Sequence, residues 1–462
     1  MYKYFFFDFD GMLADTYPHT ATCLVKTLKQ TRNKDYSYKE AYDQLKISYA
    51  TAFDYFKLSK QEIELFVKTT DNINEEPKAT LFLPIKKLLK TIQDNGYQSF
   101  IYTNRDELTF DYLEMFDIKK YFKDFIIKAN KPDPTCLNQM IEKYNLDKKE
   151  CLVIGDRDLD MHGAYNASID GLLYDVDNRV SKKYATYVIN RLNKIYNYIY
   201  LPYHILNNYH THTARCGHAT GKDEDYVIEA IKAGYQTLGF SDHFMFPDVE
   251  KNYEYFSSIR KLKEKYKDQI DIKIALECEY IDKYIPLYKK FKEAGDVDYL
   301  IFGNHGFLKE NGTTRADLIS FIHPYDDVNY FEIYFNLLKK ALDSNLFKYI
   351  CHPDCFLKGY GKWDEKTIEM AHKIGKLLQG KNVYAELSCS GIRSRKRIEF
   401  QNELVPAYPF KAFFKILKEY DLKFVIGLDA HSEKQLDDEA LQYALKIAKD
   451  LKLNLVYNIE DL

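Results

Sequence analysis

Three histidines lie within nine residues in the segment 207–221, NNYHTHTARCGHATG. His210 and His212 are two residues apart, so on a β-strand both imidazoles point to the same face of the sheet. His218 follows after a Cys-Gly turn. Imidazole is a common metal ligand, but an isolated H-x-H pair is more often a hydrogen-bonded polar pair than a metal site. The residues downstream therefore have to distinguish a metal site from a polar pair.

Short apolar runs further along the chain repeatedly end in a side chain that can bind a metal. These side chains are His243, Glu277, His305, His352, Asp429 and His431. Segments with helical spacing separate the runs, at 223–233, 255–266, 328–342, 365–378 and 409–420. Alternating strands and helices predict a parallel sheet, and the count reaches seven strands when the runs at 207–212 and 382–388 are included. Functional side chains at the carboxyl ends of such strands are typical of a barrel with its site at that face.

These runs resemble the successive motifs of the PHP (polymerase and histidinol phosphatase) superfamily, and they are nearest to its histidinol-phosphatase branch. The matching segments are HTHTARCGHATG, SDHF, ALECEYI, GNHGF, CHPD, SCSGIR and GLDAHS. The similarity runs from about Tyr209 to the C-terminus. Three departures concern substrate detail: Ala275 and Leu428 stand where Gly or Ser is usual, and SCSG lacks the usual Asn.

The resemblance implies a distorted seven-stranded (β/α) barrel with a cluster of two or three metals. The implied ligands are His210, His212, His218, His243, Glu277, His305, His352, Asp429 and His431. A mixture of imidazoles and carboxylates favours Zn²⁺, Mn²⁺ or Fe²⁺ over Mg²⁺ alone. In this branch activated water attacks phosphorus directly, so no covalent intermediate is expected.

The resemblance further implies that Arg393 contacts the substrate phosphate, a role suited to a planar fork of donors. Other nearby residues are expected to be structural or solvent-facing: Arg395, Lys396 and Arg397 as a solvated run, His323 as a surface histidine, and Cys216, Cys351 and Cys355 as packing residues or neighbours of the ligands.

The opening run YKYFFFDFDG predicts a buried strand that ends in Asp8, with Asp10 two residues further on. Two carboxylates at one strand end repel each other unless a cation or a phosphoryl group lies between them. This arrangement suits a nucleophile with an acid/base partner. Further polar side chains follow at two more strand ends and in the loop NKPDP, namely Thr103, Asn104, Lys131, Asp156 and Asp160.

In this order, these residues resemble the four motifs of the haloacid dehalogenase (HAD) superfamily, from Met1 to about Tyr198, although Met12 stands where Thr is usual. The resemblance implies a doubly wound, Rossmann-like α/β domain with its site at the carboxyl ends of the strands and a helical cap at about 17–78. It also implies a role for each residue of the site. Asp8 attacks phosphorus to form an aspartyl-phosphate, Asp10 protonates the leaving oxygen, Thr103, Asn104 and Lys131 bind phosphoryl oxygens, and Asp8 and Asp156, with Asp10 and Asp160 as further candidates, bind Mg²⁺.

Composition narrows the class of protein. The chain has 462 residues, with 66 Lys and Arg against 69 Asp and Glu, so no general charge attracts nucleic acid or an anionic membrane. The eight cysteines contain no C-x-x-C pair and are expected to be reduced thiols in the cytoplasm. The opening residues do not resemble a signal peptide or a spanning helix. A helix is expected near 185–198, and Pro202 places a boundary between domains at 1–202 and 203–462.

The sequence therefore predicts a cytoplasmic, bifunctional phosphatase that acts on small phosphorylated metabolites. The second domain is expected to hydrolyse L-histidinol phosphate to L-histidinol, a step of histidine biosynthesis. Two alternatives stay open at this point. The second domain could be a general phosphoesterase or a nuclease, and the first could be a regulatory module without catalysis. The sequence does not indicate an oligomeric state.

Overall fold

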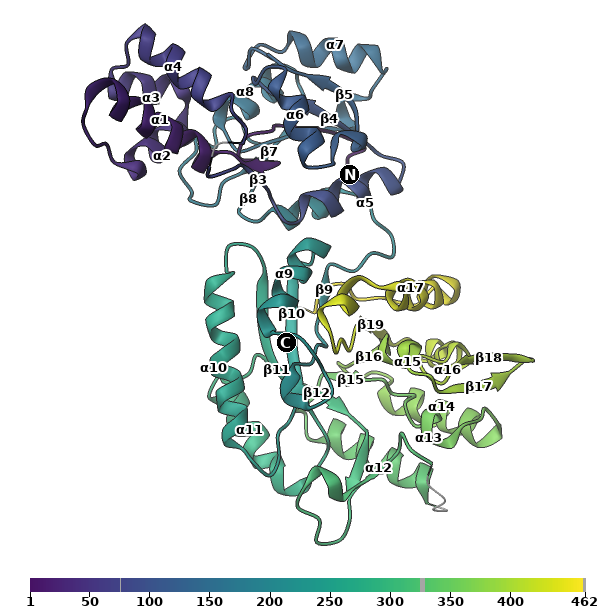
Figure 1. Cartoon of the computed structure of the whole chain (residues 1–462). Helices are drawn as coiled ribbons and strands as arrows, with labels where there is room; N and C mark the ends of the chain where they lie inside the picture. Colours follow the sequence, from purple (N-terminus) through teal and green to yellow (C-terminus); the bar gives the residue numbers. More distant parts are fainter. Residues whose placement is uncertain (75, 325–328, 460–462) are drawn as a thin grey trace. The chain divides into compact units, whose positions relative to one another are not determined.

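The computed structural model describes residues 1–74, 76–324 and 329–459. The chain forms two compact units, Met1–Leu201 and Pro202–Leu462 (Figure 1). Each unit contains its own parallel sheet.

The first unit is built on a six-stranded parallel sheet with β1 inside it. The strand order is β5-β4-β1-β6-β7-β8, with β1 at Tyr4–Phe7, β4 at Gln98–Tyr102, β5 at Phe122–Ile126, β6 at Cys151–Gly155, β7 at Asp170–Tyr174 and β8 at Tyr187–Ile189. Phe5, Phe6 and Phe7 are fully buried, as the run of apolar residues predicts for a central parallel strand. β4 and β5 lie on one side of β1, and β6, β7 and β8 lie on the other, so the strand order reverses at β1. The carboxyl end of β1 is therefore a topological switch point, where a site is expected. The doubly wound fold is confirmed.

Helices cover this sheet, and a separate helical bundle stands beside it. The covering helices are α5 (Ile85–Asp94), α6 (Leu108–Met115), α7 (Thr135–Lys143) and α8 (Asp158–Asn166). The bundle contains α1 (Tyr17–Arg32), α2 (Tyr38–Ile47), α3 (Tyr49–Phe56) and α4 (Lys60–Thr70), and it lies to one side of the sheet in Figure 1. It has its own core, which includes Leu24, Leu45 and Phe66. The chain enters and leaves the bundle through β2 (Ala14–Asp15) and β3 (Thr80–Leu81), which pair antiparallel.

The helix expected near 185–198 is a wrong prediction. Tyr187–Ile189 forms β8, which pairs with β7, and only Leu192–Tyr198 is helical, as a 3₁₀ segment. The β-branched Val188 and Ile189 suit a strand, and the open edge of β7 offers backbone partners that an isolated segment of sequence does not reveal.

The second unit contains seven parallel strands in chain order. They are β9 (Asn207–Asn208), β10 (Thr237–His243), β11 (Asp271–Cys278), β12 (Tyr299–Gly303), β15 (Tyr349–Cys351), β16 (Tyr384–Ser388) and β19 (Lys423–Gly427). A parallel bridge between Thr211 and Ala430 joins the segments that follow the two edge strands, β9 and β19. The sheet therefore nearly closes on itself, and the predicted distorted seven-stranded barrel is confirmed.

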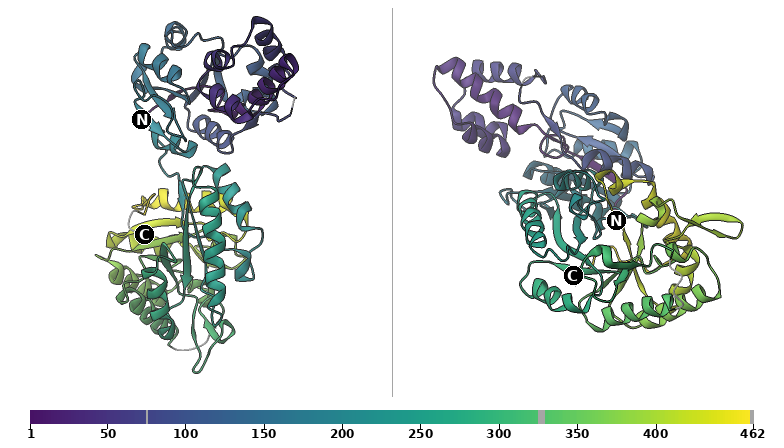
Figure 2. Two further views of the ribbon diagram at one scale, coloured as in Figure 1. Left: turned by 90° about the vertical axis from the view of Figure 1, so that its left-hand side faces the viewer. Right: turned by 60° about the horizontal axis from the view of Figure 1, so that its bottom comes forward.

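Helices alternate with these strands and lie outside the sheet (Figures 1 and 2). They are α9 (Asp223–Ala233), α10 (Glu250–Lys265), α11 (Ile285–Glu293), α12 (Tyr330–Asp343), α13 (Leu357–Tyr360), α14 (Glu365–Leu378), α15 (Ser390–Arg393), α16 (Lys411–Leu417) and α17 (Glu439–Leu451). α10 begins five residues earlier than expected, and Val328, the expected start of the helix that contains α12, lies outside the described residues.

Two antiparallel hairpins were not expected from the sequence. β13 (Gly306–Leu308) pairs with β14 (Leu318–Ser320), and β17 (Arg397–Phe400) pairs with β18 (Glu403–Pro406). No helix in the described part of the chain has both the length and the apolar character needed to cross a membrane.

Candidate active sites

In the first unit, Lys131 holds two of the predicted carboxylates at the carboxyl end of β1. Its Nζ lies 2.8 Å from Asp8 Oδ1 and 2.5 Å from Asp160 Oδ1, and all three side chains are buried. Burial raises the pKa of Asp8 to about 6, although the Lys131 charge acts in the opposite direction. Burial also opposes the charge of Lys131, but Asp160 and Asp8 outweigh it and keep the pKa of this ammonium above its usual value.

Asp10 pairs with an arginine, Arg105, and not with Lys131. Arg105 donates from Nε and Nη2 to its two carboxylate oxygens at 3.1 and 2.8 Å, and Thr16 donates at 2.6 Å. Burial would raise the pKa of Asp10, yet Arg105 reverses the effect and lowers it. Asp10 is therefore a carboxylate in this arrangement. Proton donation by Asp10 requires its contact with Arg105 to weaken first.

Asp156 presents an oxygen that no described residue satisfies. Its Oδ2 accepts the Tyr17 hydroxyl at 2.7 Å, whereas Oδ1 is buried and accepts no hydrogen bond from the residues that the structure describes. Burial raises the pKa of Asp156 to about 8, and Asp8 adds repulsion. A buried carboxylate oxygen left without a donor fits a hard cation such as Mg²⁺.

The remaining predicted residues of this unit lie around the same strand ends. Thr103 is buried just beyond β4, and Asn104 Oδ1 accepts the backbone N–H of Lys131 at 2.9 Å. The sequence analysis did not single out Arg105 or Arg157. Arg157 donates to the Tyr17 hydroxyl at 3.0 Å and to the Leu45 carbonyl at 3.2 Å, so it connects the site to α2. Their positions in the segments TNR and GDR were the available signal.

In the second unit, Glu277 lies at the end of β11 and presents its two oxygens to two different groups of imidazoles. Oε2 is 2.9 Å from His243 Nδ1 and 3.4 Å from His212 Nε2. Oε1 is 3.0 Å from His352 Nε2 and 3.3 Å from His305 Nε2. Burial opposes the charge of Glu277, but the imidazoles hold its pKa well below the usual value. A carboxylate in this position can bridge two cations.

Asp429 is the second carboxylate of this cluster, and three imidazoles surround it. Its Oδ1 lies 3.2 Å from His212 Nε2, 3.7 Å from His210 Nε2 and 3.5 Å from His431 Nδ1. His431 Nε2 in turn lies 2.9 Å from His218 Nε2. The fold thus brings all nine predicted ligands into one cluster, although they are spread from His210 to His431 in the chain.

Several atoms of this cluster fit a bound metal better than any partner in the protein. Ligand atoms of three sets lie within 4.8 Å of one another: His218, His243 and His431; His210, His212 and Asp429; and His212, His243 and Glu277. Glu277 Oε2 and Asp429 Oδ1 are buried and accept no hydrogen bond from the described residues. Nε2 of His210 and Nε2 of His212 are 3.1 Å apart, where two lone pairs repel unless a proton or a cation lies between them. The donor set therefore suits divalent cations that accept nitrogen and oxygen ligands.

Comparisons with known proteins find a family match in each unit. Residues 5–173 match the family model of haloacid dehalogenase-like hydrolases, and residues 208–390 match that of the PHP domain. The chain therefore contains a haloacid dehalogenase-like domain in its N-terminal part and a PHP domain in its C-terminal part.

Curated relatives extend the comparison. A probable histidinol-phosphatase of Deinococcus radiodurans is 26% identical over 231 residues, 48% of this chain and 85% of that protein. A probable histidinol-phosphatase of Schizosaccharomyces pombe is 26% identical over 255 residues, 49% of this chain and 81% of that protein. A phosphoglycolate phosphatase of Vibrio parahaemolyticus is 30% identical over 92 residues, 19% of this chain and 40% of that protein.

Glu386 of the PHP domain is a residue of the site that the sequence analysis missed. It is fully buried on β16 and accepts hydrogen bonds from His210 Nδ1 at 2.8 Å, the Tyr349 hydroxyl at 2.7 Å and the His352 backbone N–H at 2.9 Å. An acidic residue inside the apolar run NVYAELS was the available signal. Its carboxylate fixes which nitrogen of His210 faces the cluster.

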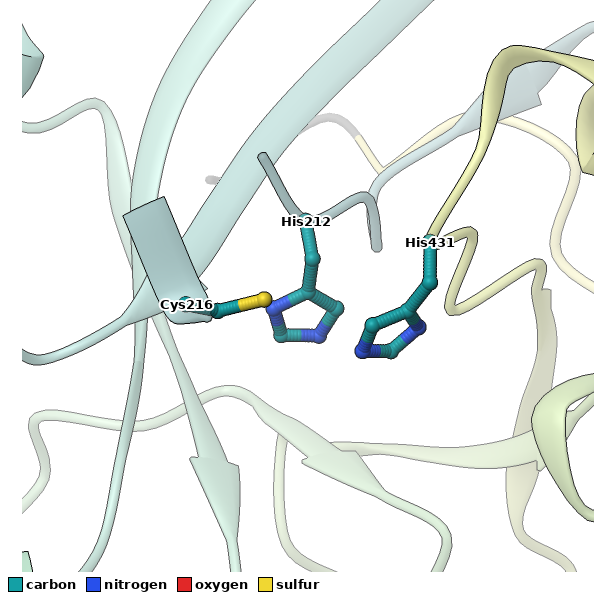
Figure 3. A group of neighbouring side chains, drawn as sticks. All are labelled: His212, Cys216 and His431. Atoms are coloured by element: carbon teal, nitrogen blue, oxygen red, sulfur yellow. The ribbon is translucent and has the colours of Figure 1, made fainter. Parts of the chain in front are cut away.

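Two cysteines lie beside the ligands of the PHP domain. The Cys216 side chain points toward the His212 ring, and His431 lies on the other side of that ring (Figure 3). The rings of His212 and His431 stack with centroids 4.4 Å apart. Cys351 Sγ lies 3.2 Å from Glu277 Oε1 and 2.8 Å from the Phe302 carbonyl. Burial keeps the pKa of Cys351 well above its usual value, so this side chain is a neutral thiol.

Arg393 lines the cavity of the PHP domain, but most of its N–H groups form hydrogen bonds within the protein. It bonds Asp438 through Nε and Nη2 at 2.7 and 3.0 Å, the Leu428 carbonyl at 2.6 Å and the Gln435 carbonyl at 2.9 Å. A guanidinium has five N–H groups, so these four bonds leave one for a ligand. The cavity has a volume of about 720 Å³, and its lining includes Glu277, Asp429 and the exposed His323.

Proposed function

We propose that both domains hydrolyse phosphate monoesters and that the PHP domain acts on L-histidinol phosphate. In this proposal residues 1–202 form the HAD-like phosphatase and residues 203–462 form the PHP phosphoesterase. The observation that carries it is the placement of seven of the nine proposed metal ligands in the wall of a cavity of about 720 Å³, a size typical of small-molecule sites, with the other two, His210 and His212, directly behind them. The relatives named as histidinol-phosphatases support the choice of substrate.

In the HAD-like domain, one oxygen of Asp8 attacks phosphorus, the ester P–O bond breaks, and an aspartyl-phosphate forms. Once its contact with Arg105 has weakened and it is protonated, Asp10 gives its proton to the departing alkoxide, and it then accepts a proton from the water that hydrolyses the aspartyl-phosphate. Lys131 binds a phosphoryl oxygen, with Thr103 and Asn104 beside it, and Asp160 keeps its ammonium in place. Asp8 and Asp156 would hold Mg²⁺, which neutralises charge on the phosphoryl group when bound.

In the PHP domain, nine side chains would hold two or three divalent cations, with Zn²⁺, Mn²⁺ and Fe²⁺ as the candidates. They are His210, His212, His218, His243, Glu277, His305, His352, Asp429 and His431. When bound, such cations activate water and stabilise the negative charge that develops on the phosphoryl group. Glu277 and Asp429 supply the negative charges of the set, Glu386 orients His210, and Arg393 retains one N–H for a phosphoryl oxygen.

Two narrower alternatives concern the same sites. A PHP domain that acts as a general phosphoesterase or nuclease would use the same cluster on a different ester. A regulatory HAD-like domain would bind a phosphorylated metabolite at Asp8 and Lys131 without turnover. The cytoplasmic location stays a prediction.

The test is a panel of phosphate esters, including histidinol phosphate and a single-stranded oligonucleotide, offered to the full-length protein with Mg²⁺ and with Mn²⁺ or Zn²⁺. Asp8→Asn should remove the Mg²⁺-dependent activity alone, because the PHP cluster shares no residue with Asp8. Glu277→Gln should remove histidinol phosphate hydrolysis alone. Loss of both activities in a folded Asp8→Asn protein would contradict two independent sites, and cleavage of the oligonucleotide with no turnover of histidinol phosphate would favour the nuclease.

A further inference from the structure

Three cationic side chains line the PHP cavity, and two of them are paired with a carboxylate. They are Arg315, Lys358 and Arg393. Asp438 pairs with Arg393 at 2.7 Å, and Glu279 pairs with Arg315 at 3.0 Å. Lys358 is half-buried, and among the described residues its ammonium makes no hydrogen bond or ion pair. Lysine is rarely withdrawn from water without a partner, so an unbalanced ammonium in the wall of this cavity fits an anionic ligand.

The turn that carries Lys358 is fixed by the surrounding fold. α13 follows β15 and His352, and the Tyr330 hydroxyl bonds to the carbonyl of Phe321 and, at 3.0 Å, to that of Phe356. A Cβ on Gly359 would collide with the carbonyl oxygens of Phe321 and His323, so this glycine permits the turn to pack against the segment after β14. The backbone that carries Lys358 is therefore packed against the rest of the domain.

Arg315 forms an ion pair with Glu279, whose carboxylate is almost completely buried. Glu279 follows β11, is 1% exposed, and accepts a hydrogen bond from Arg315 Nη2. Arg315 Nη1 donates to the Phe244 carbonyl at 3.3 Å, and Asp317 accepts the backbone N–H groups of Thr313 and Thr314 to close the turn. Two of the five guanidinium N–H groups are used in these bonds to the described residues, which leaves three. Arg315, which lines the cavity, thus has more N–H groups left for a ligand than Arg393 has.

The charges of the cavity wall determine which kind of ligand these cations fit. Within the described residues, the only carboxylates that line the cavity are Glu277 and Asp429, which belong to the metal cluster. Apart from these two, no carboxylate of a described residue in that wall competes for Lys358 or for the remaining N–H groups of Arg315. A phosphate group carries negative charge and three acceptor oxygens, so it can accept bonds from both residues.

We propose that Lys358 and Arg315 bind the phosphate group of the substrate in the PHP cavity, Lys358 through its unbalanced charge and Arg315 through its three remaining N–H groups. The proposal rests on the proposed phosphatase function and adds two substrate-binding residues to it. Arg393, with a single free N–H, supplies the smaller share of phosphate binding.

The test uses the full-length, metal-loaded protein in the Asp8→Asn background, so that any remaining ester hydrolysis belongs to the PHP domain. Inorganic phosphate is the probe, measured as the inhibition constant against histidinol phosphate. Lys358→Met should raise both this constant and KM by about 10-fold or more, with kcat changed less and with unchanged metal content, because a hydrogen bond to a charged group is lost. Lys358→Arg should restore most of the affinity. Arg395→Met removes an exposed positive charge that does not line the cavity, and it should leave both constants within about twofold.

Arg315→Lys is the second variant, because it keeps a cation above Glu279 and avoids an unpaired buried carboxylate. It should weaken phosphate binding less than Lys358→Met does. A phosphate inhibition constant within twofold of the parent in both Lys358→Met and Arg315→Lys, with the metals retained, would overturn the proposal. If the Asp8→Asn protein hydrolyses no ester, the proposed PHP activity fails, and calorimetric titration of inorganic phosphate still decides the binding site. In that titration, weaker phosphate binding by Lys358→Met than by the parent protein supports the proposed site. Equal phosphate affinity of the two proteins contradicts it.

Discussion

Glu386 Oε1 accepts a hydrogen bond from Nδ1 of His210 at 2.8 Å, and neither side chain is exposed to solvent. The bond leaves Nε2 of His210 facing Glu277 and Asp429. A carboxylate behind a ligating imidazole fixes its tautomer and increases its basicity, so Glu386 would strengthen the proposed metal binding by His210 without being a ligand itself.

Glu386→Gln should lower metal affinity by about 10- to 100-fold while the protein stays folded, because the charge behind His210 is lost and the volume is nearly kept. Titration with buffered Zn²⁺ or Mn²⁺ measures the effect. Tyr349→Phe is the matched control, since it removes one neutral hydrogen bond to the same carboxylate at 2.7 Å. Its effect should be smaller. Equal metal affinity in Glu386→Gln and the parent protein would show that Glu386 has only a packing role.

Gly303→Ala should disorganise the metal cluster from the end of β12. A Cβ at this position would collide with the Glu277 carboxylate and the His305 ring, so Glu277 would have to move. We expect less metal per chain by elemental analysis and loss of the PHP activity. Gly295→Ala is the control in the same unit, because its Cβ meets nothing within 4 Å and it adds only the backbone strain of a residue at φ +69°. Full metal content in Gly303→Ala would mean that the cluster tolerates displacement of Glu277.

Gly11→Ala should inactivate the HAD-like domain and spare the PHP domain. Gly11 adopts φ +73°, and a Cβ there would collide with the Asp156 carboxylate and the Tyr17 ring. Gly96→Ala, at φ +77° and with nothing within 4 Å of its Cβ, carries the backbone cost alone, about 1–2 kcal/mol. The Mg²⁺-dependent rate should therefore fall in Gly11→Ala and survive in Gly96→Ala. A similar loss of rate in both variants would assign the effect to stability instead of the site.

Glu62 stabilises the helical bundle in a pH-dependent manner. Arg32 bonds both of its oxygens, at 2.6 and 2.9 Å, and Glu62 closes a capping box with Ser59 at the start of α4. Hydrogen bonds from Arg32 outweigh the opposing effect of burial and hold the pKa of Glu62 below its usual value. Because folding lowers this pKa, the stabilisation is complete above the unfolded pKa of about 4.3 and declines as the pH falls below it.

Glu62→Ala should therefore lower the opening free energy of α4 by about 2 kcal/mol at pH 7, as measured by native-state hydrogen exchange. The difference between the parent and Glu62→Ala should shrink as the pH falls below about 4. Glu64→Ala, at an exposed position of the same helix, should change this free energy by less than about 0.5 kcal/mol. A difference between parent and Glu62→Ala that stays constant from pH 7 to pH 3 would exclude the ionised carboxylate as its source.

Much of this architecture is encoded locally. The strands near Asp8, His243, Glu277 and His305 are visible in the sequence as short, mostly apolar runs, because burial of a parallel strand favours a continuous apolar stretch. The carboxyl ends of parallel strands meet at one face, so the order of such runs already predicts a shared site. The barrel of the second unit was predicted from this alternation, whereas the doubly wound fold of the first unit was implied by the resemblance of its motifs to the haloacid dehalogenase superfamily.

Other features depend on contacts between distant segments. β8 forms because β7 leaves an open edge, and 185–198 by itself favoured a helix. Glu386 looked like one acidic residue in an apolar strand until the barrel placed it behind His210, 176 residues earlier in the chain.

The sequence by itself determined which side chains are able to bind a metal and which of them follow short apolar runs, because both are local properties of the chain. Only the tertiary structure decided how the charges are paired: Arg393 is held by Asp438, Arg315 by Glu279, and Lys358 by none of the described residues. The physical reason is that pairing depends on distances of a few ångströms between loops that follow different strands, and near closure of the barrel sets those distances.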